Sequence, residues 1–253
     1  MKRTLTALLL LSALLLCACG RAEDAPETAA PVIETEEPVM ETKLPETAAA
    51  RLLYLGHGSV RIVTPEEKVI YIDPYAPGDY SLPADLILVT HDHFDHCKYE
   101  CIESRQPDCT VITQVEALAG GEHHSFDLPY VTVQAVEAGN NKNHSIQSCV
   151  GYVLTLSDGV KVYLSGDTSE TAQMAEMADM AIDYAFFCCD GVYNMDDAEA
   201  ARCAALVGAK HNIPYHNHPA GRDGKYFDAE KAARFPADNL LVILPGEEIE
   251  LQK

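Results

Sequence analysis

The stretch from residue 84 to residue 96 constrains the fold most strongly, because a buried strand runs directly into a cluster of metal-binding side chains. Residues 84–89 (ADLILV) are apolar and rich in branched side chains, which is typical of a buried strand. Residues 90–96 (THDHFDH) follow at once. In an extended chain alternate side chains share a face, so we expect one group to project together from the strand end, namely His91, His93 and Asp95. His96 points elsewhere and could serve a second ion. Imidazoles suit zinc and similar metals.

Further candidate ligands lie next to other predicted strands. The run 160–164 (VKVYL) leads into Ser165-Gly166-Asp167-Thr168, where glycine permits a tight turn and Asp167 could bridge two cations. His144 lies in a loop before the run around 150–154, and His216 and His218 follow a short apolar stretch. Each of these residues is weak evidence for a metal site when taken alone. Together they supply the further ligands that two ions would need beyond residues 91–96.

These residues resemble the motifs of the metallo-β-lactamase-fold hydrolase superfamily. Residues 91–96 match its HxHxDH motif, His144 its third-motif histidine, Asp167 its bridging aspartate and His216 its last histidine. The blocks 53–59, 71–74, 191–195 and 213–216 look like those of the branch that contains ascorbate-6-phosphate lactonase and many uncharacterised metal-dependent hydrolases. The resemblance covers residues 51–253 and is specific for the fold and the metal site, not for the substrate.

The resemblance implies a site for two divalent metal ions, with zinc favoured and manganese or iron as alternatives. It assigns His91, His93 and His144 to one ion, and Asp95, His96 and His216 to the other. Asp167 would bridge the ions, and Asp95 and Asp167 are the candidate catalytic carboxylates. Two such ions would share a water and lower its pKa towards neutrality.

Four other residues are candidates for supporting roles. Asp73 is expected to hydrogen-bond a ligand histidine and fix its tautomer. By sequence alone, Asp73 could equally be an ordinary turn residue before Pro74. The candidates for contact with substrate or with the ligands are His57, Tyr193 and His218. His123 and His124 are expected in an exposed turn and His211 at a strand start. Cys97 is adjacent to His96, but Cys101 four residues later indicates a helix face instead of a ligand.

Motif details and charge exclude several activities. Oxygen-reducing di-iron relatives commonly carry glutamate where this chain has His93, and β-lactam-opening relatives typically lack either His96 or Asp167. A nucleic-acid substrate needs basic surface, whereas 18 Lys and Arg face 39 Asp and Glu, a formal net charge of -21. We therefore expect a small-molecule substrate and no nucleic-acid partner; the oligomeric state stays open.

The first 50 residues predict a membrane anchor and a tether. Residues 1–18 combine a basic start with an apolar run too short to span a bilayer, as in a signal peptide. Cys19 follows Ala18 and resembles the lipidated cysteine of a bacterial lipobox, with Cys17 as the competing acceptor and ordinary signal cleavage as the alternative. Residues 19–50 are rich in Glu, Pro, Thr and Ala and predict an extended linker. The chain is therefore expected in a bacterial cell envelope, attached by its lipid to the extracytoplasmic face of a membrane.

Residues 51–253 have the length of a single domain. Apolar runs predict strands at 51–55, 59–63, 69–73, 85–90, 110–113, 130–136, 150–156, 160–164, 182–187, 210–213 and 239–244. Helices are predicted at 97–105, 170–180 and 196–207. The resemblance makes this α/β pattern a four-layer αββα sandwich. The seven cysteines from Cys97 to Cys203 are expected to stay free, with Cys188 and Cys189 packed in the core.

Two functional classes follow. The favoured one is a dinuclear metal-dependent hydrolase that acts on a small lactone, thioester or phosphoester. The alternative is a surface-tethered binding or metal-handling lipoprotein that keeps the fold without turnover. A complete ligand set for two ions favours catalysis.

Overall fold

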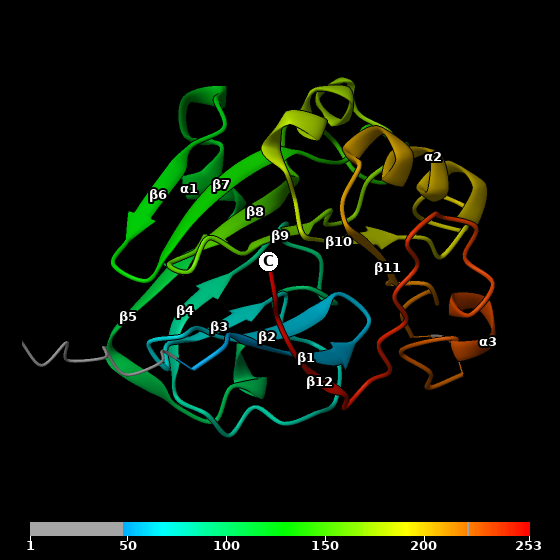
Figure 1. Ribbon diagram of the computed structural model, residues 1–253. Coiled ribbons are helices and arrows are strands. Elements are labelled where there is room, and N and C mark those ends of the chain that lie inside the picture. Colours follow the sequence, from blue (N-terminus) through cyan, green and yellow to red (C-terminus); the bar gives the residue numbers. More distant parts are fainter. Residues whose placement is uncertain (1–47, 222) are drawn as a thin grey trace, which may run out of the picture. The chain divides into compact units, whose positions relative to one another are not determined.

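The computed structural model describes residues 48–221 and 223–253 (Figure 1). The predicted signal peptide, Cys17, Cys19 and nearly all of the predicted linker lie outside these residues. Within the described part of the chain, no helix is long and apolar enough to cross a membrane.

Two mixed sheets of six strands each form the centre of the domain. In the first sheet the order is β12-β1-β2-β3-β4-β5, and in the second it is β11-β10-β9-β8-β7-β6. The first sheet's strands are β1 (Arg51–Gly56), β2 (Ser59–Val63), β3 (Val69–Ile72), β4 (Ala84–Leu88), β5 (Arg105–Ile112) and β12 (Glu248–Glu250). The second sheet's strands are β6 (Ser125–Leu128), β7 (Val131–Glu137), β8 (Val150–Leu156), β9 (Lys161–Leu164), β10 (Tyr184–Cys188) and β11 (His211–Tyr215).

Each sheet combines antiparallel and parallel pairing. In the first sheet β3, β4 and β5 run parallel, while β1, β2 and β12 pair antiparallel. In the second sheet β9, β10 and β11 run parallel, and β6 to β9 pair antiparallel. Parallel neighbours end at the same edge of a sheet, so the residues that follow β3, β4, β9, β10 and β11 are well placed to form a site.

The strands β1 to β4 of the first sheet are buried on both faces, which explains their continuous apolar runs. Leu52 and Tyr54 of β1 belong to the large core cluster shared with the second sheet, whereas Leu53 and Leu55 belong to a smaller cluster on the other face. Alternate residues of a strand point to opposite faces, so one short run serves two layers of packing.

Helices complete the layers (Figure 1). The helix α2 (Asp197–Val207) packs against β10 and against the 3₁₀ helix η3 (Ala172–Met180). Asp196 caps α2 by accepting a hydrogen bond from the Glu199 amide, and Gly208 ends it with a φ of 66°. The remaining pieces are short: η1 (Tyr99–Cys101), α1 (Gln114–Ala117), η2 (Ala119–Gly121) and α3 (Ala229–Ala232). The expected α/β sandwich is confirmed.

Two predicted elements are wrong. The helix expected at 97–105 is reduced to η1, because packing onto the smaller core cluster and not local periodicity selects the conformation; the residues that pack there are Cys97, Tyr99 and Cys101. The strand expected at 239–244 makes only a single bridge, between Asn212 and Leu240. The last strand is β12 instead, which pairs with β1 after the turn at Gly246.

Candidate metal centre

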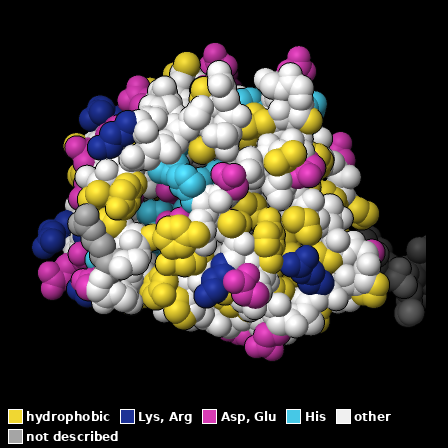
Figure 2. Space-filling view, turned by 180° about the vertical axis from the view of Figure 1, so that it is seen from behind, with side chains coloured by type: hydrophobic (Ala, Val, Ile, Leu, Met, Phe, Trp, Pro, Cys, Tyr) yellow, Lys and Arg dark blue, Asp and Glu magenta, His cyan; other side chains and the backbone are white. Residues whose placement is uncertain are grey.

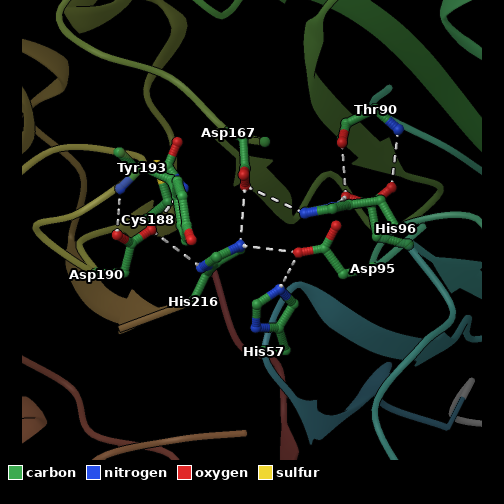
Figure 3. Close-up of polar contacts among 12 residues, drawn as sticks. His57, Thr90, Asp95, His96, Asp167, Cys188, Asp190, Tyr193 and His216 are labelled. Atoms are coloured by element: carbon green, nitrogen blue, oxygen red, sulfur yellow. Dashed lines mark hydrogen bonds and ion pairs between the residues drawn. The ribbon is translucent and has the colours of Figure 1, made fainter. Parts of the chain in front are cut away.

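The predicted ligands converge where strands of both sheets end (Figure 3). Asp73 follows β3, residues 90–96 follow β4, Asp167 follows β9 and His216 follows β11. His144 reaches the same place from the loop between β7 and β8. All of the predicted ligands are therefore gathered at one edge of the sandwich.

A first group joins three imidazoles. Ligand nitrogens of His91, His93 and His144 lie within 4.8 Å of one another. His91 and His144 are buried, whereas His93 is exposed to solvent. This set coincides with the one that the sequence assigned to the first ion.

A second group is fully buried and contains one residue more than expected. Its potential ligand atoms also lie within 4.8 Å of one another and come from His57, Asp95, His96 and His216. His57 Nε2 donates to Asp95 Oδ2 at 3.1 Å, and its ring lies 3.6 Å from that of His216, centroid to centroid. His57 thus contacts two members of the set assigned to the second ion.

Asp167 lies between the two groups. Its Oδ1 atom is 3.3 Å from Nε2 of both His96 and His216, and its Oδ2 atom is 3.2 Å from Nε2 of His144. Gly166 precedes it with a φ of 60°, and a Cβ there would lie 2.7 Å from the Val150 carbonyl oxygen. The close turn at Gly166 therefore positions one carboxylate against ligands of both groups.

The Nδ1 atoms of several ligand histidines make hydrogen bonds to side chains outside the two ligand groups. His96 Nδ1 donates to Asp73 Oδ2 at 2.7 Å. Thr90 donates to the same carboxylate through its hydroxyl and its amide, at 2.7 and 2.8 Å. Because the Thr90 hydroxyl donates its proton to Asp73, the Thr90 hydroxyl oxygen accepts a hydrogen bond from His91 Nδ1, 3.0 Å away. His144 Nδ1 faces Asn141 Oδ1 at 3.3 Å. These contacts leave the Nε2 atoms free to bind a cation.

The donor set fits divalent metal ions. Buried atoms without a hydrogen-bond partner include Nε2 of His91, His96 and His216, together with Oδ1 of Asp167. Such atoms are costly unless something pairs with them. Nitrogen and carboxylate ligands that converge in this way suit zinc, manganese or iron. These atoms have the chemistry of a cation site.

The pKa values show how strongly the centre attracts positive charge. Burial acts to raise the pKa of Asp167, but the facing imidazoles of His216 and His96 bring it well below its usual range. Burial acts to lower the pKa of His96, but Asp167 and Asp73 raise it well above its usual value. The pKa of His216 is raised as well, chiefly by Asp167 against the effect of burial. With no cation present, the carboxylates draw protons onto these imidazoles.

His91 and His57 behave in the opposite way. Burial lowers the pKa of His91 to about 2, with a further contribution from His96. Burial and the neighbouring His216 lower the pKa of His57 to about 4. Both rings are therefore neutral near pH 7 and can offer a lone pair.

Sequence reasoning missed Asp190, a buried carboxylate that follows β10. Its Oδ2 atom lies 3.5 Å from His216 Nδ1. Its Oδ1 atom accepts from the amides of Val192 and Tyr193 at 2.6 and 2.7 Å, so it also fixes the next loop. An available signal was the strand-to-Asp-to-turn pattern that Asp190 shares with Asp73. Asn141 and Thr90 were missed too, since nothing local marks them as partners of histidines.

Close approach and unusual backbone shape the site. A Cβ at Gly58 would lie 2.9 Å from Cε1 of the His96 ring, so a side chain there would displace this imidazole. Three non-glycine residues of this site have a left-handed φ, a strained conformation that clusters at functional sites: His57 at 52°, Asp73 at 44° and His216 at 40°.

An open cavity of about 500 Å³ lies over the two groups. Its floor is formed by His93, Asp95, His144, Asp167 and His216. Its rim is formed by Phe94, Asn143, Tyr193 and Ala220. Figure 2 shows the histidines in a hollow with hydrophobic side chains beside it.

The remaining candidates are placed as follows. Tyr193 lines the cavity, whereas His218 faces Asp223 at 3.2 Å and is not among the lining residues. His211 begins β11, as expected. His123 and His124 are half-buried, so the expectation of an exposed turn is wrong; His124 Nε2 donates to the Ala119 carbonyl.

The cysteines of the described chain follow the expectation. All seven are free, and Cys188 and Cys189 are buried in the core. Cys97 Sγ faces the His93 carbonyl oxygen at 3.2 Å and belongs to neither ligand group.

Comparison with known proteins agrees with this geometry. The family described as "Beta-lactamase superfamily domain" matches residues 51–216. A UPF0173 metal-dependent hydrolase of Rubrobacter xylanophilus is 31% identical over 66% of this chain and 81% of its own length. One from Koribacter versatilis is 29% identical over 66% of this chain and 83% of its own length. A crystal structure from Parabacteroides distasonis, described as that of a metal-dependent hydrolase, is 28% identical, with a TM-score of 0.59 over 75% of this chain and 90% of its own.

Proposed function

The chain belongs to the UPF0173 metal-dependent hydrolases of the β-lactamase superfamily, and on that premise we propose that it hydrolyses a small molecule with water activated by two divalent metal ions. The bond that is hydrolysed is that of a lactone, a thioester or a phosphoester. His91, His93 and His144 would hold one ion, Asp95, His96 and His216 would hold the other, and Asp167 would contribute to both.

The observation that carries the proposal is the position of Asp167. Its two oxygens face different ligand groups, with His144 on one side and His96 and His216 on the other. A carboxylate that served a single ion would need contact with only one group. The unpartnered Nε2 atoms on both sides give the same indication.

The chain's own residues hold and orient the reacting groups. When bound, two divalent ions lower the pKa of a shared water and stabilise charge on the substrate oxygen. Asp73, Thr90 and Asn141 accept hydrogen bonds from the Nδ1 atoms of ligand histidines and so fix the orientation of the rings. The three histidines are His96, His91 and His144, in that order. The cavity leaves the floor accessible from one side, so a substrate approaches the ions over His93, Asp95 and Asp167.

Replacement of Asp167 tests the proposal. Metal-loaded full chain is expected to hold close to two divalent ions, measured by atomic emission after removal of free metal. Asp167→Ala should retain mainly one ion and lose turnover of every substrate that the parent hydrolyses in a panel of lactones, thioesters and phosphodiesters. Two retained ions with full activity in this variant would refute the bridging role.

The alternative is a binding or metal-handling protein without turnover. It predicts the same metal content but no hydrolysis by the parent chain. The same panel therefore separates the two functions.

We also propose that Cys19 carries a lipid anchor that attaches the domain to the envelope membrane. Cys19→Ser should release the protein from membranes in a fractionation experiment without a change in the domain's activity. Continued membrane attachment of Cys19→Ser, with release in Cys17→Ser, would instead identify Cys17 as the acceptor.

A further inference from the structure

The rim of the cavity concentrates exposed apolar surface. The large hydrophobic side chains exposed in the described chain are Phe94, Val115, Ile146, Val192, Tyr193 and Leu244. Phe94 and Tyr193 line the cavity, and they are 68% and 43% exposed. Ile146 lies two residues after His144, and Val192 precedes Tyr193. Apolar side chains left in water together mark a surface that binds an apolar group.

The two aromatic side chains come from different loops, the one after β4 and the one after β10, and both line the same cavity. Phe94 lies between His93 and Asp95 and packs edge-on against Tyr75, with the ring centroids 5.8 Å apart. The Tyr193 amide donates to Asp190, and its carbonyl accepts from Asn143 Nδ2 at 2.9 Å. Because these contacts hold the loop before substrate arrives, little ordering is needed on binding.

The described residues that line the cavity carry no positive charge away from the predicted metal ligands. Its charged lining residues are Asp95 and Asp167, both predicted ligands, and no Lys or Arg is among the described residues that line it. The whole chain has a formal net charge of -21. Among these described residues, a phosphate on the distal part of a substrate would face aromatic rings and the Asn143 amide, none of which is an arginine or lysine of the kind that phosphate recognition uses.

We propose that the substrate is an uncharged ester or lactone with an apolar group that packs between Phe94 and Tyr193. This inference builds on the proposed function and narrows its substrate class. In the reaction, the oxygen of water bonds to the carbonyl carbon and the bond from that carbon to the alcohol oxygen breaks. A proton from water ends on the leaving alcohol oxygen, and the products are a carboxylic acid and an alcohol.

Two γ-lactones test the inference, one with an alkyl side chain and one with the same chain ending in a phosphate group. The bond that breaks is the same in both, so their ratio of kcat/KM reports the distal contact alone. The parent should prefer the alkyl lactone by about tenfold or more, the scale of discrimination available to an apolar pocket. Phe94→Ala and Tyr193→Ala should each raise KM for the alkyl lactone several-fold and reduce this preference, with metal content unchanged.

Matched variants separate packing from other effects. Tyr193→Phe should keep the preference, because the ring and not the hydroxyl makes the contact, and Val115→Ala should match the parent, because Val115 does not line the cavity. Tyr193→Lys should shift the preference towards the phosphate lactone. An unchanged preference in the Phe94 and Tyr193 alanine variants, or a loss in Tyr193→Phe equal to that in Tyr193→Ala, would overturn the inference.

Binding provides a readout that does not depend on turnover. Saturation-transfer NMR on metal-free and metal-loaded full chain should show the alkyl lactone bound more tightly than the phosphate lactone. Equal or tighter binding of the phosphate lactone to the metal-free chain would overturn the inference. Tighter binding of the alkyl lactone without hydrolysis of either compound would instead support the pocket assignment and refute ester hydrolysis.

Discussion

The two ligand groups of the metal centre differ in burial and in how they are held. The first group includes the exposed His93, and His144 is held by the neutral amide of Asn141 at 3.3 Å. The second group is buried throughout, and its His96 is held by the carboxylate of Asp73 at 2.7 Å. Charge-assisted hydrogen bonds are shorter and about twice as strong as neutral ones.

This difference indicates that the two groups would bind their ions with different affinities. The second group is surrounded by the carboxylates of Asp73, Asp95, Asp167 and Asp190, so its histidines are fixed before any ion binds. Both groups contribute to the cavity floor, but only the first contains a ligand that is exposed to solvent, His93. We therefore expect the second ion to bind more tightly and the first to exchange more readily.

Removal of one ligand from each group has the largest expected effect. His216→Ala and His93→Ala should each reduce kcat by at least about a thousandfold, since either change removes part of the metal-dependent acceleration. The stability of the metal-free protein should separate them: His216→Ala leaves a gap in the core and costs about 1–3 kcal/mol, whereas His93→Ala stays within about 0.5 kcal/mol.

Turnover and urea unfolding of the metal-free variants measure both effects. His124→Ala, outside both ligand groups, should keep normal turnover. Normal turnover in His216→Ala would show that the second ion is dispensable or that another histidine replaces this ligand.

Loss of the Asp73 charge has the next largest expected effect. Asp73→Asn removes the carboxylate that orients His96, and substitutions of this kind typically reduce metal affinity by about 10–100-fold. Competition with a chromophoric chelator should show that metal affinity falls at the second site and stays unchanged at the first. An equal loss at both sites would contradict the assignment of Asp73 to the second group.

The affinity of the second group for metal should depend on pH. The pKa of His96 and of His216 is raised, chiefly by Asp167 against the effect of burial, so protons on these rings compete with a cation as the pH falls. Each displaced proton changes the apparent affinity by about tenfold per pH unit below the raised pKa. The low pKa of His91, about 2, removes this competition from that ligand of the first group.

Zinc titrations at pH 6, 7 and 8 should therefore show affinity that rises with pH at the tighter site and changes less at the weaker one. Flat affinity at the tighter site would mean that its imidazoles are neutral throughout this range.

The smallest expected effect comes from Asn141→Ala. The change removes the neutral hydrogen bond to the His144 ring, together with those that Asn141 Oδ1 accepts from the amides of Asn143 and His144. The ring contact is worth about 0.5–1.5 kcal/mol, or roughly a 2–10-fold loss of affinity at the first site. The chelator competition used for Asp73→Asn also measures the loss of metal affinity in Asn141→Ala, so the two losses can be compared directly. A larger loss for Asn141→Ala than for Asp73→Asn would reverse the order of the two groups.

The sequence by itself determined most of the strands and the residues that end them. Strands buried on both faces leave continuous apolar runs, so β2, β3, β4, β8 and β9 were found close to their observed bounds. The resemblance to the superfamily brought the residues at 91, 93, 95, 96, 144, 167 and 216 together before their contacts were known. Strand alternation alone was wrong about Asp95: it grouped Asp95 with His91 and His93, whereas the chain turns after β4 and Asp95 lies with His96 and His216. The edge strand β5 is largely exposed and was predicted only in its last, apolar part.

Tertiary structure alone decided which groups hold these side chains in place. His57 lies against His216, Asp190 faces the other nitrogen of that ring, and Asn141 faces His144. The first two contacts join distant segments, and all three depend on loop geometry. Local periodicity carries no information about such contacts, because it reports burial along one segment and not the partner across the core. For the same reason it could not distinguish a helix from extended chain at 97–105, where only packing on the outer face of the first sheet selects the conformation.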